Sequence, residues 1–162
     1  MNRRTVLCSS SAIAALALAG IKVTRGADAA AGYRVVHSDT EWRNILGPAA
    51  YDVLRREGTE PPFTSPLLHE KRAGMFHCAG CALPLYSSRT KYDSGTGWPS
   101  FWDHLPHAIQ TREDNSFGMV RTEVHCSQCG GHLGHVFPDG PPPTGLRYCM
   151  NGVALSFTPE VA

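Results

Sequence analysis

The spacing of apolar and polar residues is helical in only one part of the chain, just after an Ala/Leu-rich leader. Ser38 is followed three residues later by Glu41, which predicts a capping box and a helix over 38–46. A second short helix is expected over 48–56, because its proline is well placed in a first turn, and Gly58 should terminate it. The pattern therefore predicts two short N-terminal helices.

Further along, the apolar residues form short or alternating runs separated by Gly, Pro, Asn and Asp, a pattern typical of antiparallel strands. In the run 120–124 the β-branched residues share one face, while Arg121 and Glu123 fall on the other. Asp114-Asn115 should form the hairpin turn leading into this strand, and the last strand is expected at 153–157. We therefore expect two small helices packed on an all-β body.

The first 29 residues have the order of a secretory signal. Basic residues at Arg3-Arg4 precede an apolar stretch over 6–21, and small residues follow at 27–29. The paired arginines indicate a twin-arginine-like signal. An uncleaved membrane anchor is the alternative, but a span needs about 20 apolar residues, and this stretch is shorter and interrupted by serines. We expect cleavage, export to the bacterial periplasm and no stable membrane association of the mature segment 30–162.

Composition and charge narrow the class of protein. A chain of 162 residues with Gly 16 and Pro 12 is typical of one turn-rich globular domain. The leader holds four of the 15 cations and one of the 14 anions, so the rest of the chain carries 11 against 13. This surface lacks the basic residues that sequence-independent nucleic-acid binding requires. Nothing in the sequence demands more than a monomer.

Four of the six cysteines form two CxxC pairs. Two thiolates separated by two residues can point at one ion, and two such pairs match tetrahedral zinc. The 44 residues between the pairs exceed a usual zinc-finger gap, so the ion would join two distant hairpins as a structural staple. The predicted ligands are Cys78, Cys81, Cys126 and Cys129.

Other interpretations of the four cysteines stay open. Export to an oxidising compartment favours disulfides, although a bond within a CxxC pair is strained. A thioredoxin-like dithiol would need a βαβ context that is absent here. Iron could replace zinc, and His77 or His125 could in principle replace a sulfur.

Cys149 has no partner once the four are paired and Cys8 is removed with the leader. Arg147 lies two residues before it on the same strand face, where its charge would favour the thiolate. Asn151 lies two residues after it and can donate a hydrogen bond. A lone cysteine is more often inert than reactive, but these neighbours favour a nucleophile.

Acid and base groups lie upstream of that cysteine. His132 and His135 fall in one short run, and Asp139 follows in a Pro-Asp-Gly turn. Nucleophilic attack by a sulfur, coupled to proton delivery, requires a thiol together with acid and base groups. Two imidazoles and a carboxylate can provide these. Each histidine taken alone is better explained by a structural role than by a catalytic one.

Several ordered motifs carry a resemblance that spans nearly all of the mature chain. They are Gly58-Thr59-Glu60-Pro61-Pro62-Phe63, Cys78-Ala79-Gly80-Cys81, Ser94-Gly95-Thr96-Gly97-Trp98-Pro99-Ser100-Phe101, Gly118-Met119-Val120-Arg121-Thr122-Glu123-Val124, His132-Leu133-Gly134-His135-Val136-Phe137-Pro138-Asp139-Gly140 and Gly145-Leu146-Arg147-Tyr148-Cys149-Met150-Asn151. The chain resembles the methionine sulfoxide reductase B family, the peptide-methionine (R)-S-oxide reductases. The resemblance implies a mainly β fold of two antiparallel sheets with short N-terminal helices, and a structural zinc ion away from the active site.

The resemblance also implies roles for single residues. The Cys149 thiolate would attack the sulfoxide sulfur of peptide-bound methionine-R-sulfoxide, and a sulfenic acid would remain. Proton delivery would involve His132, His135 or water that they hold, helped by Asp139 and Asn151. Trp98 would pack on the substrate methyl group, and Phe101 would support the pocket. The implied function is protein repair under oxidative stress, with oxidised proteins as substrates.

One position departs from many relatives. They place a resolving cysteine where this chain has Thr96. With four cysteines on zinc, no thiol remains to form an internal disulfide with Cys149. We therefore expect a thioredoxin-like or other external thiol to reduce the sulfenic acid directly.

Two competing functions remain. A zinc-ribbon binding module with a buried Cys149 is disfavoured by the acidic balance of the mature chain. A general thiol-disulfide oxidoreductase would need a second active thiol.

Overall fold

The computed structural model describes residues 32–161. The leader predicted over 1–29, with Cys8, lies outside the described residues. Within the described part of the chain, no helix is both long and apolar enough to cross a membrane.

The N-terminal helical segment is α2 (Asp39–Arg56), and it begins as predicted. The Ser38 hydroxyl accepts from the Glu41 backbone N–H, and the Glu41 carboxylate accepts from the Ser38 N–H, which completes the capping box. Non-helical angles at Gly47 break the segment into the two predicted pieces. The expected terminator, Gly58, is wrong by one residue, because Glu57 takes the left-handed C-cap position.

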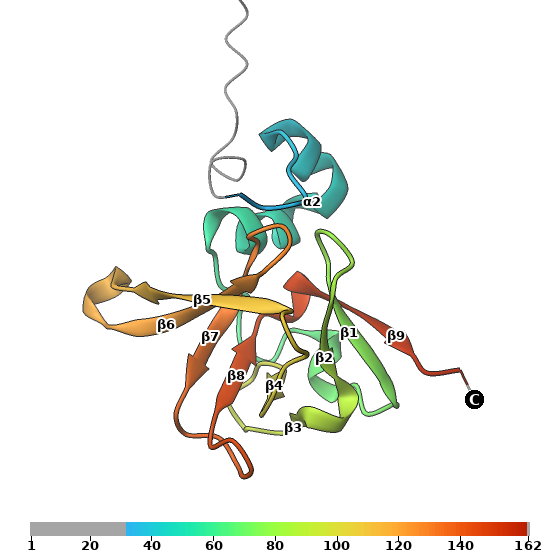
Figure 1. Ribbon diagram of the computed structural model, residues 1–162, viewed down its shortest axis with the longest axis vertical. Helices are drawn as coiled ribbons and strands as arrows, with labels where there is room; N and C mark the ends of the chain where they lie inside the picture. Colours follow the sequence, from blue (N-terminus) through green and yellow to red (C-terminus); the bar gives the residue numbers. More distant parts are fainter. Residues whose placement is uncertain (1–31, 162) are drawn as a thin grey trace, which may run out of the picture.

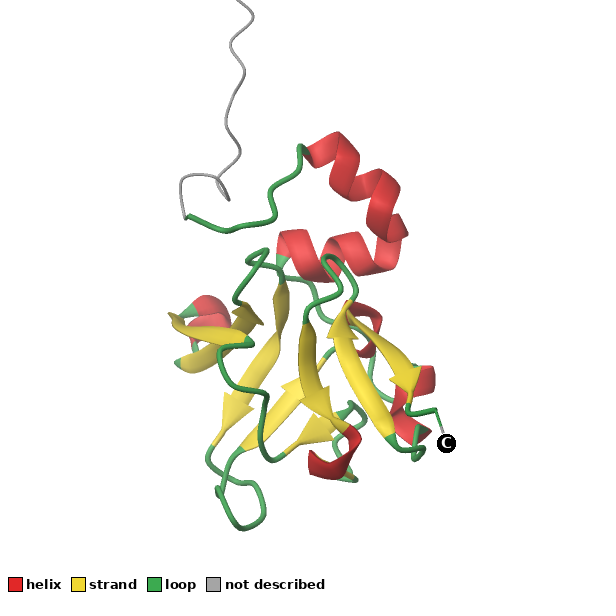
Figure 2. Cartoon of the chain, turned by 45° about the vertical axis from the view of Figure 1, so that its right-hand side comes forward, coloured by secondary structure: helices red, strands yellow, loops and turns green. Residues whose placement is uncertain are grey.

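Nine strands and four short 3-10 helices follow α2 in two antiparallel sheets (Figures 1 and 2). The strand orders are β2-β1-β9 and β3-β4-β8-β7-β6-β5. The bounds along the chain are η1 (Pro66–His69), β1 (Gly74–Cys78), β2 (Pro84–Ser87), η2 (Ser88–Thr90), β3 (Lys91–Tyr92), β4 (Ser100–Phe101), β5 (Ile109–Asp114), η3 (Ser116–Gly118), β6 (Arg121–Cys126), β7 (His132–Phe137), β8 (Arg147–Met150), η4 (Gly152–Ala154) and β9 (Leu155–Pro159). The predicted fold class, mainly β with two antiparallel sheets, is confirmed.

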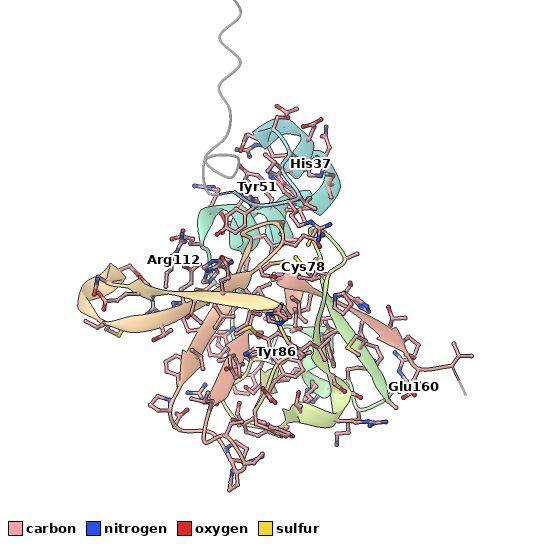
Figure 3. The ribbon with its side chains drawn as sticks, viewed as in Figure 1. His37, Tyr51, Cys78, Tyr86, Arg112 and Glu160 are labelled. Atoms are coloured by element: carbon pink, nitrogen blue, oxygen red, sulfur yellow. The ribbon has the colours of Figure 1, made fainter. Side chains whose placement is uncertain are left out.

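Aromatic side chains fill the core. Tyr86 from β2 stacks on Phe101 from β4, with ring centroids 4.4 Å apart, and Phe76 from β1 meets the same ring at 5.0 Å. The Tyr86 hydroxyl lies 3.1 Å from the Met150 sulfur of β8, and Figure 3 shows Tyr86 among the strands. Because Met150 and Tyr148 of β8 point into this core, the alternating Arg147 and Cys149 point to the other face of the larger sheet.

Two expectations about strands need correction. The last strand runs over Leu155–Pro159, because η4 occupies the first residues of the predicted run. The strand expected over 120–124 runs over Arg121–Cys126, so Val120, which is 76% exposed, lies outside it, while Glu123 within it is buried. The hairpin turn expected at Asp114-Asn115 is present, with η3 completing it between β5 and β6.

Candidate active site and metal centre

Cross-strand pairing places Cys149 in a row of polar side chains across the larger sheet. Cys149 of β8 pairs with Ser100 of β4 on one side and His135 of β7 on the other. The same row continues from His135 to Glu123 of β6 and then to Arg112 of β5. Directly opposed residues share a face, so backbone register alone aligns a thiol, an imidazole and a carboxylate.

His132 joins this row through an irregularity in β7. Three residues separate His132 from His135, and a regular strand would turn them to opposite faces. The register shifts beside Val124, because one step in β6 matches two steps in β7. This extra residue in β7 has the form of a β-bulge. It returns His132 to the face of His135, and their ring centroids lie 5.4 Å apart.

A small cavity opens at Cys149. Its volume is about 120 Å³, and Trp98 provides the largest apolar side chain in its wall. A larger cavity of about 480 Å³ lies along the smaller sheet, but no cysteine lines it. We therefore take the smaller cavity as the candidate active site. It is lined by Thr59, Trp98, Arg121, Gly134, His135, Phe137, Cys149 and Asn151.

Opposing effects act on the Cys149 thiol. Its burial is the largest effect and raises the pKa above the ordinary value, although the Thr96 hydroxyl and the charge of Arg147 lower it in part. The Thr96 oxygen lies 3.8 Å from the Cys149 sulfur. The expectation that Arg147 favours the thiolate is correct in sign, but burial outweighs it. Without substrate, Cys149 is held mainly as the neutral thiol at neutral pH.

A buried carboxylate orients His132. The Nδ1 atom of His132 lies 2.7 Å from a Glu123 oxygen, and both side chains are 3% exposed. Burial would raise the pKa of Glu123, but hydrogen bonds from His132 and Arg112 outweigh it, so the carboxyl is ionised. An ionised carboxylate can only accept, so His132 carries its proton on Nδ1. Its Nε2 is buried without a protein partner.

A second carboxylate serves His135. The Nε2 atom of His135 lies 2.8 Å from an Asp114 oxygen, and Arg121 donates to that same oxygen at 2.6 Å. Hydrogen bonds from Ser116 and then from His135 hold the pKa of Asp114 well below its usual range. Burial is the main cause that lowers the pKa of His135. Each histidine of the site is therefore hydrogen-bonded to its own carboxylate, His132 to Glu123 and His135 to Asp114.

Three predicted residues lie near the thiol but are engaged elsewhere. Arg147 donates two hydrogen bonds of 2.9 Å to Asp139, and its guanidinium lies 4.4 Å from the Phe137 ring centroid. Asn151 lines the cavity, but its side chain donates to the Leu133 carbonyl and accepts from a backbone N–H. Asp139 is thus placed to position Arg147, whereas Asn151 lines the cavity and uses one of its two amide hydrogens on the Leu133 carbonyl.

The two predicted pocket aromatics occupy different places. Trp98 lies in the cavity wall, and its indole N–H donates to the Glu60 carbonyl at 2.8 Å. Phe101 is fully buried on the opposite face of the sheet, between Tyr86 and Phe76. It therefore supports the strand that carries Ser100 and has no surface to offer a substrate.

The four paired cysteines form one cluster, and Figure 3 shows its member Cys78 between the strands and α2. Their sulfurs all lie within 4.8 Å of one another, with Cys78 and Cys129 at 3.7 Å and Cys81 and Cys126 at 3.5 Å. Sulfurs about 2.3 Å from a tetrahedral ion are separated by about 3.8 Å. The four side chains thus fit a metal ion, and they are distinct from the Cys149 cavity.

Sequence reasoning missed the carboxylates of the site. From the sequence, Glu123 was assigned only to one face of a strand and Asp114 only to a turn. Glu60 appeared only within a motif. Glu60 is buried and accepts from the Gly152 N–H at 2.6 Å. The available signal for Glu123 was its place three residues before the predicted metal ligand Cys126, in a strand whose last four residues are buried.

Comparisons with known proteins agree on one family. The SelR domain model matches residues 46–159. The peptide methionine sulfoxide reductase MsrB of Pseudomonas putida (strain W619) is 60% identical over 122 residues, which cover 74% of this chain and 91% of that protein. The MsrB proteins of Agrobacterium fabrum and Leifsonia xyli subsp. xyli are 53% and 55% identical, over 78% and 79% of this chain, and each is covered to 94%.

Proposed function

The chain belongs to the SelR family of MsrB peptide methionine sulfoxide reductases, and from this premise we propose that Cys149 reduces methionine-R-sulfoxide in proteins. Family membership makes the chain an oxidoreductase that acts on sulfur and repairs oxidised methionine. The R epimer and the role of Cys149 are parts of the proposal.

One observation carries the assignment of Cys149. Among the described cysteines, it alone lies outside the four-sulfur cluster, and its cavity also holds His135 and Trp98. The cavity therefore combines a sulfur nucleophile, a proton carrier and an apolar wall. Trp98 would pack on the methyl group of the sulfoxide.

The proposed reaction moves one oxygen atom. The Cys149 sulfur attacks the sulfoxide sulfur, and a proton reaches the oxygen through His132, His135 or water that they hold. The sulfoxide oxygen transfers to Cys149, which becomes a sulfenic acid, while methionine leaves as the thioether. The neutral thiol supplies the proton that the oxygen gains, so the raised pKa of Cys149 is compatible with this balance.

An external thiol would close the cycle. It attacks the sulfenic acid, releases water and forms a mixed disulfide, and a second thiol restores Cys149. Thr96 stands beside Cys149 where a resolving cysteine would act, and the other described cysteines form the cluster. Mass spectrometry after a single turnover is expected to show no intramolecular disulfide at Cys149, and finding one would refute the one-cysteine cycle.

Zinc and export complete the proposal. Cys78, Cys81, Cys126 and Cys129 would hold one structural zinc ion, which closes the fold and takes no part in the reaction. The leader would direct the enzyme to the periplasm, where oxidised proteins are its substrates and a thioredoxin-like protein or another thiol is its reductant.

Replacing Cys149 tests the central claim. The wild-type enzyme is expected to reduce methionine-R-sulfoxide with dithiothreitol, whereas Cys149→Ser should lose at least about a thousandfold in kcat, as expected for loss of a nucleophile. Zinc content and the melting temperature serve as controls and should stay unchanged. Full turnover by Cys149→Ser would overturn the proposal.

A further inference from the structure

Phe63 combines exposure with an unusual backbone conformation. Its ring is 68% exposed, and its φ of 64° lies in the left-handed region that bulky residues rarely adopt. An exposed aromatic residue alone needs no explanation. A strained backbone that holds such a ring in water indicates a functional constraint.

Contacts with the active-site loop fix this conformation. The Phe63 N–H donates to the Gly97 carbonyl at 2.8 Å. A Cβ on Gly97 would lie 3.0 Å from two ring carbons of Phe63 and 2.8 Å from the Pro62 Cβ. Only glycine therefore lets the ring lie directly on this loop.

The loop connects Phe63 to the reacting sulfur. Gly97 is flanked by Thr96, whose hydroxyl lies 3.8 Å from the Cys149 sulfur, and by Trp98 in the cavity wall. Phe63 does not line the cavity itself. The exposed ring thus stands at the rim, on the side where Thr96 and Trp98 meet.

We propose that Phe63 is a specificity-determining residue that contacts the polypeptide flanking the sulfoxide. This inference rests on the proposed function. The cavity, at about 120 Å³, is well below the roughly 300–1,000 Å³ of sites that enclose whole small molecules. It therefore suits one side chain, and the neighbouring substrate residues must lie on the rim. An aromatic ring fixed in advance gives them apolar contact at little entropic cost.

Two substitutions separate the ring from the backbone strain. Phe63→Ala removes the ring and keeps the strain, whereas Phe63→Gly removes both. Kinetics are compared on a pentapeptide with a central methionine-R-sulfoxide and on free methionine-R-sulfoxide. Both variants are expected to raise KM for the peptide by about five- to tenfold, the scale of one aromatic contact. The rise in KM for free methionine-R-sulfoxide should be several-fold smaller. Phe63→Tyr, which keeps an aromatic ring, should keep the wild-type KM for the peptide.

Ile45→Ala is the matched control, because Ile45 is also an exposed apolar residue, at 50%, and lies on α2. It should leave both substrates unaffected. Equal losses on both substrates, or a Phe63→Gly enzyme with wild-type peptide KM, would overturn the inference while the reductase function stood. A wild-type enzyme that is inactive on both substrates would instead overturn the proposed function.

Discussion

Burial governs the reactivity of Cys149 more than any single neighbour does. The thiol lies in a sheet, where loss of hydration raises its pKa above the ordinary 9.0. Arg147 is two residues away, but its guanidinium is shared with Asp139, which reduces the field that it can direct at the sulfur. Among the groups that lower the pKa of Cys149, the Thr96 hydroxyl has the largest effect.

Alkylation should reveal this balance through its pH dependence. Because iodoacetamide reacts with the thiolate, the rate at Cys149 should keep rising through pH 9.0, the ordinary pKa. Thr96→Val removes a hydrogen bond worth about 0.5–1.5 kcal/mol, so the rate at pH 7.5 should fall about two- to tenfold. Peptide mapping by mass spectrometry reads Cys149 separately from the four clustered cysteines. A rate that levels off near pH 7 would contradict the raised pKa.

Single residues also show where sequence reasoning stopped. Spacing sufficed for the CxxC pairs and for the Ser38 cap, because both depend on neighbours close in sequence. It failed for Glu123, whose burial follows from β7 and Arg112 across the sheet. It also did not foresee that Asn151 donates one of its two amide hydrogens to the Leu133 carbonyl.

Among the elements, β7 contributes most to the site. Its irregular step places His132 and His135 on one face, and no local sequence pattern predicts a bulge at that step. Gly134 lies within this segment, and a Cβ there would be 2.1 Å from the Cys149 carbonyl oxygen. The glycine therefore permits β7 and β8 to approach closely at the site.

Gly134→Ala should damage both stability and activity. The added carbon meets backbone that cannot rotate away, so the free energy of unfolding should fall by about 3 kcal/mol or more. Urea denaturation measures this loss, and kcat should fall as His135 and Cys149 lose alignment. Gly118→Ala is the control, because Gly118 has a positive φ and open space around it. It should cost only about 1–2 kcal/mol, and an equal loss in both variants would show that conformation, not close approach, matters.

The sequence predicted the start of α2 correctly but misplaced the start of β9, and the difference has a physical reason. The start of α2 is set by a local cap, and its break follows from Gly47 and the adjacent proline. The start of β9 was misplaced, because η4 is fixed by hydrogen bonds from Gly152 and Val153 to the distant Glu60 carboxylate. Long-range contacts of this kind leave no local pattern.

Over the whole molecule, the cysteine cluster joins parts that are far apart in sequence. Cys78 ends β1 of the smaller sheet and Cys81 follows it, whereas Cys126 ends β6 of the larger sheet and Cys129 lies between β6 and β7. The helix α2 packs over this cluster, since Arg55 donates to the Cys129 carbonyl and Trp42 lies close to Gly80 (Figure 1). A metal ion here would hold both sheets and the helix together.

Metal removal should therefore unfold the protein without any direct effect on the chemistry. A structural zinc site contributes about 10–16 kcal/mol, whereas the whole stability of a domain is about 5–15 kcal/mol. The purified enzyme should contain one zinc per chain, and chelation should abolish the near-ultraviolet circular dichroism of its buried aromatic side chains together with activity. Cys126→Ser should behave like the chelated protein, while Cys149→Ser should keep its zinc and its melting temperature. Because the cluster is separate from the Cys149 cavity, zinc should affect activity only through folding. Activity and the folded fraction should therefore fall together as zinc is removed. A metal-free protein that melts as the wild type does would exclude the structural role.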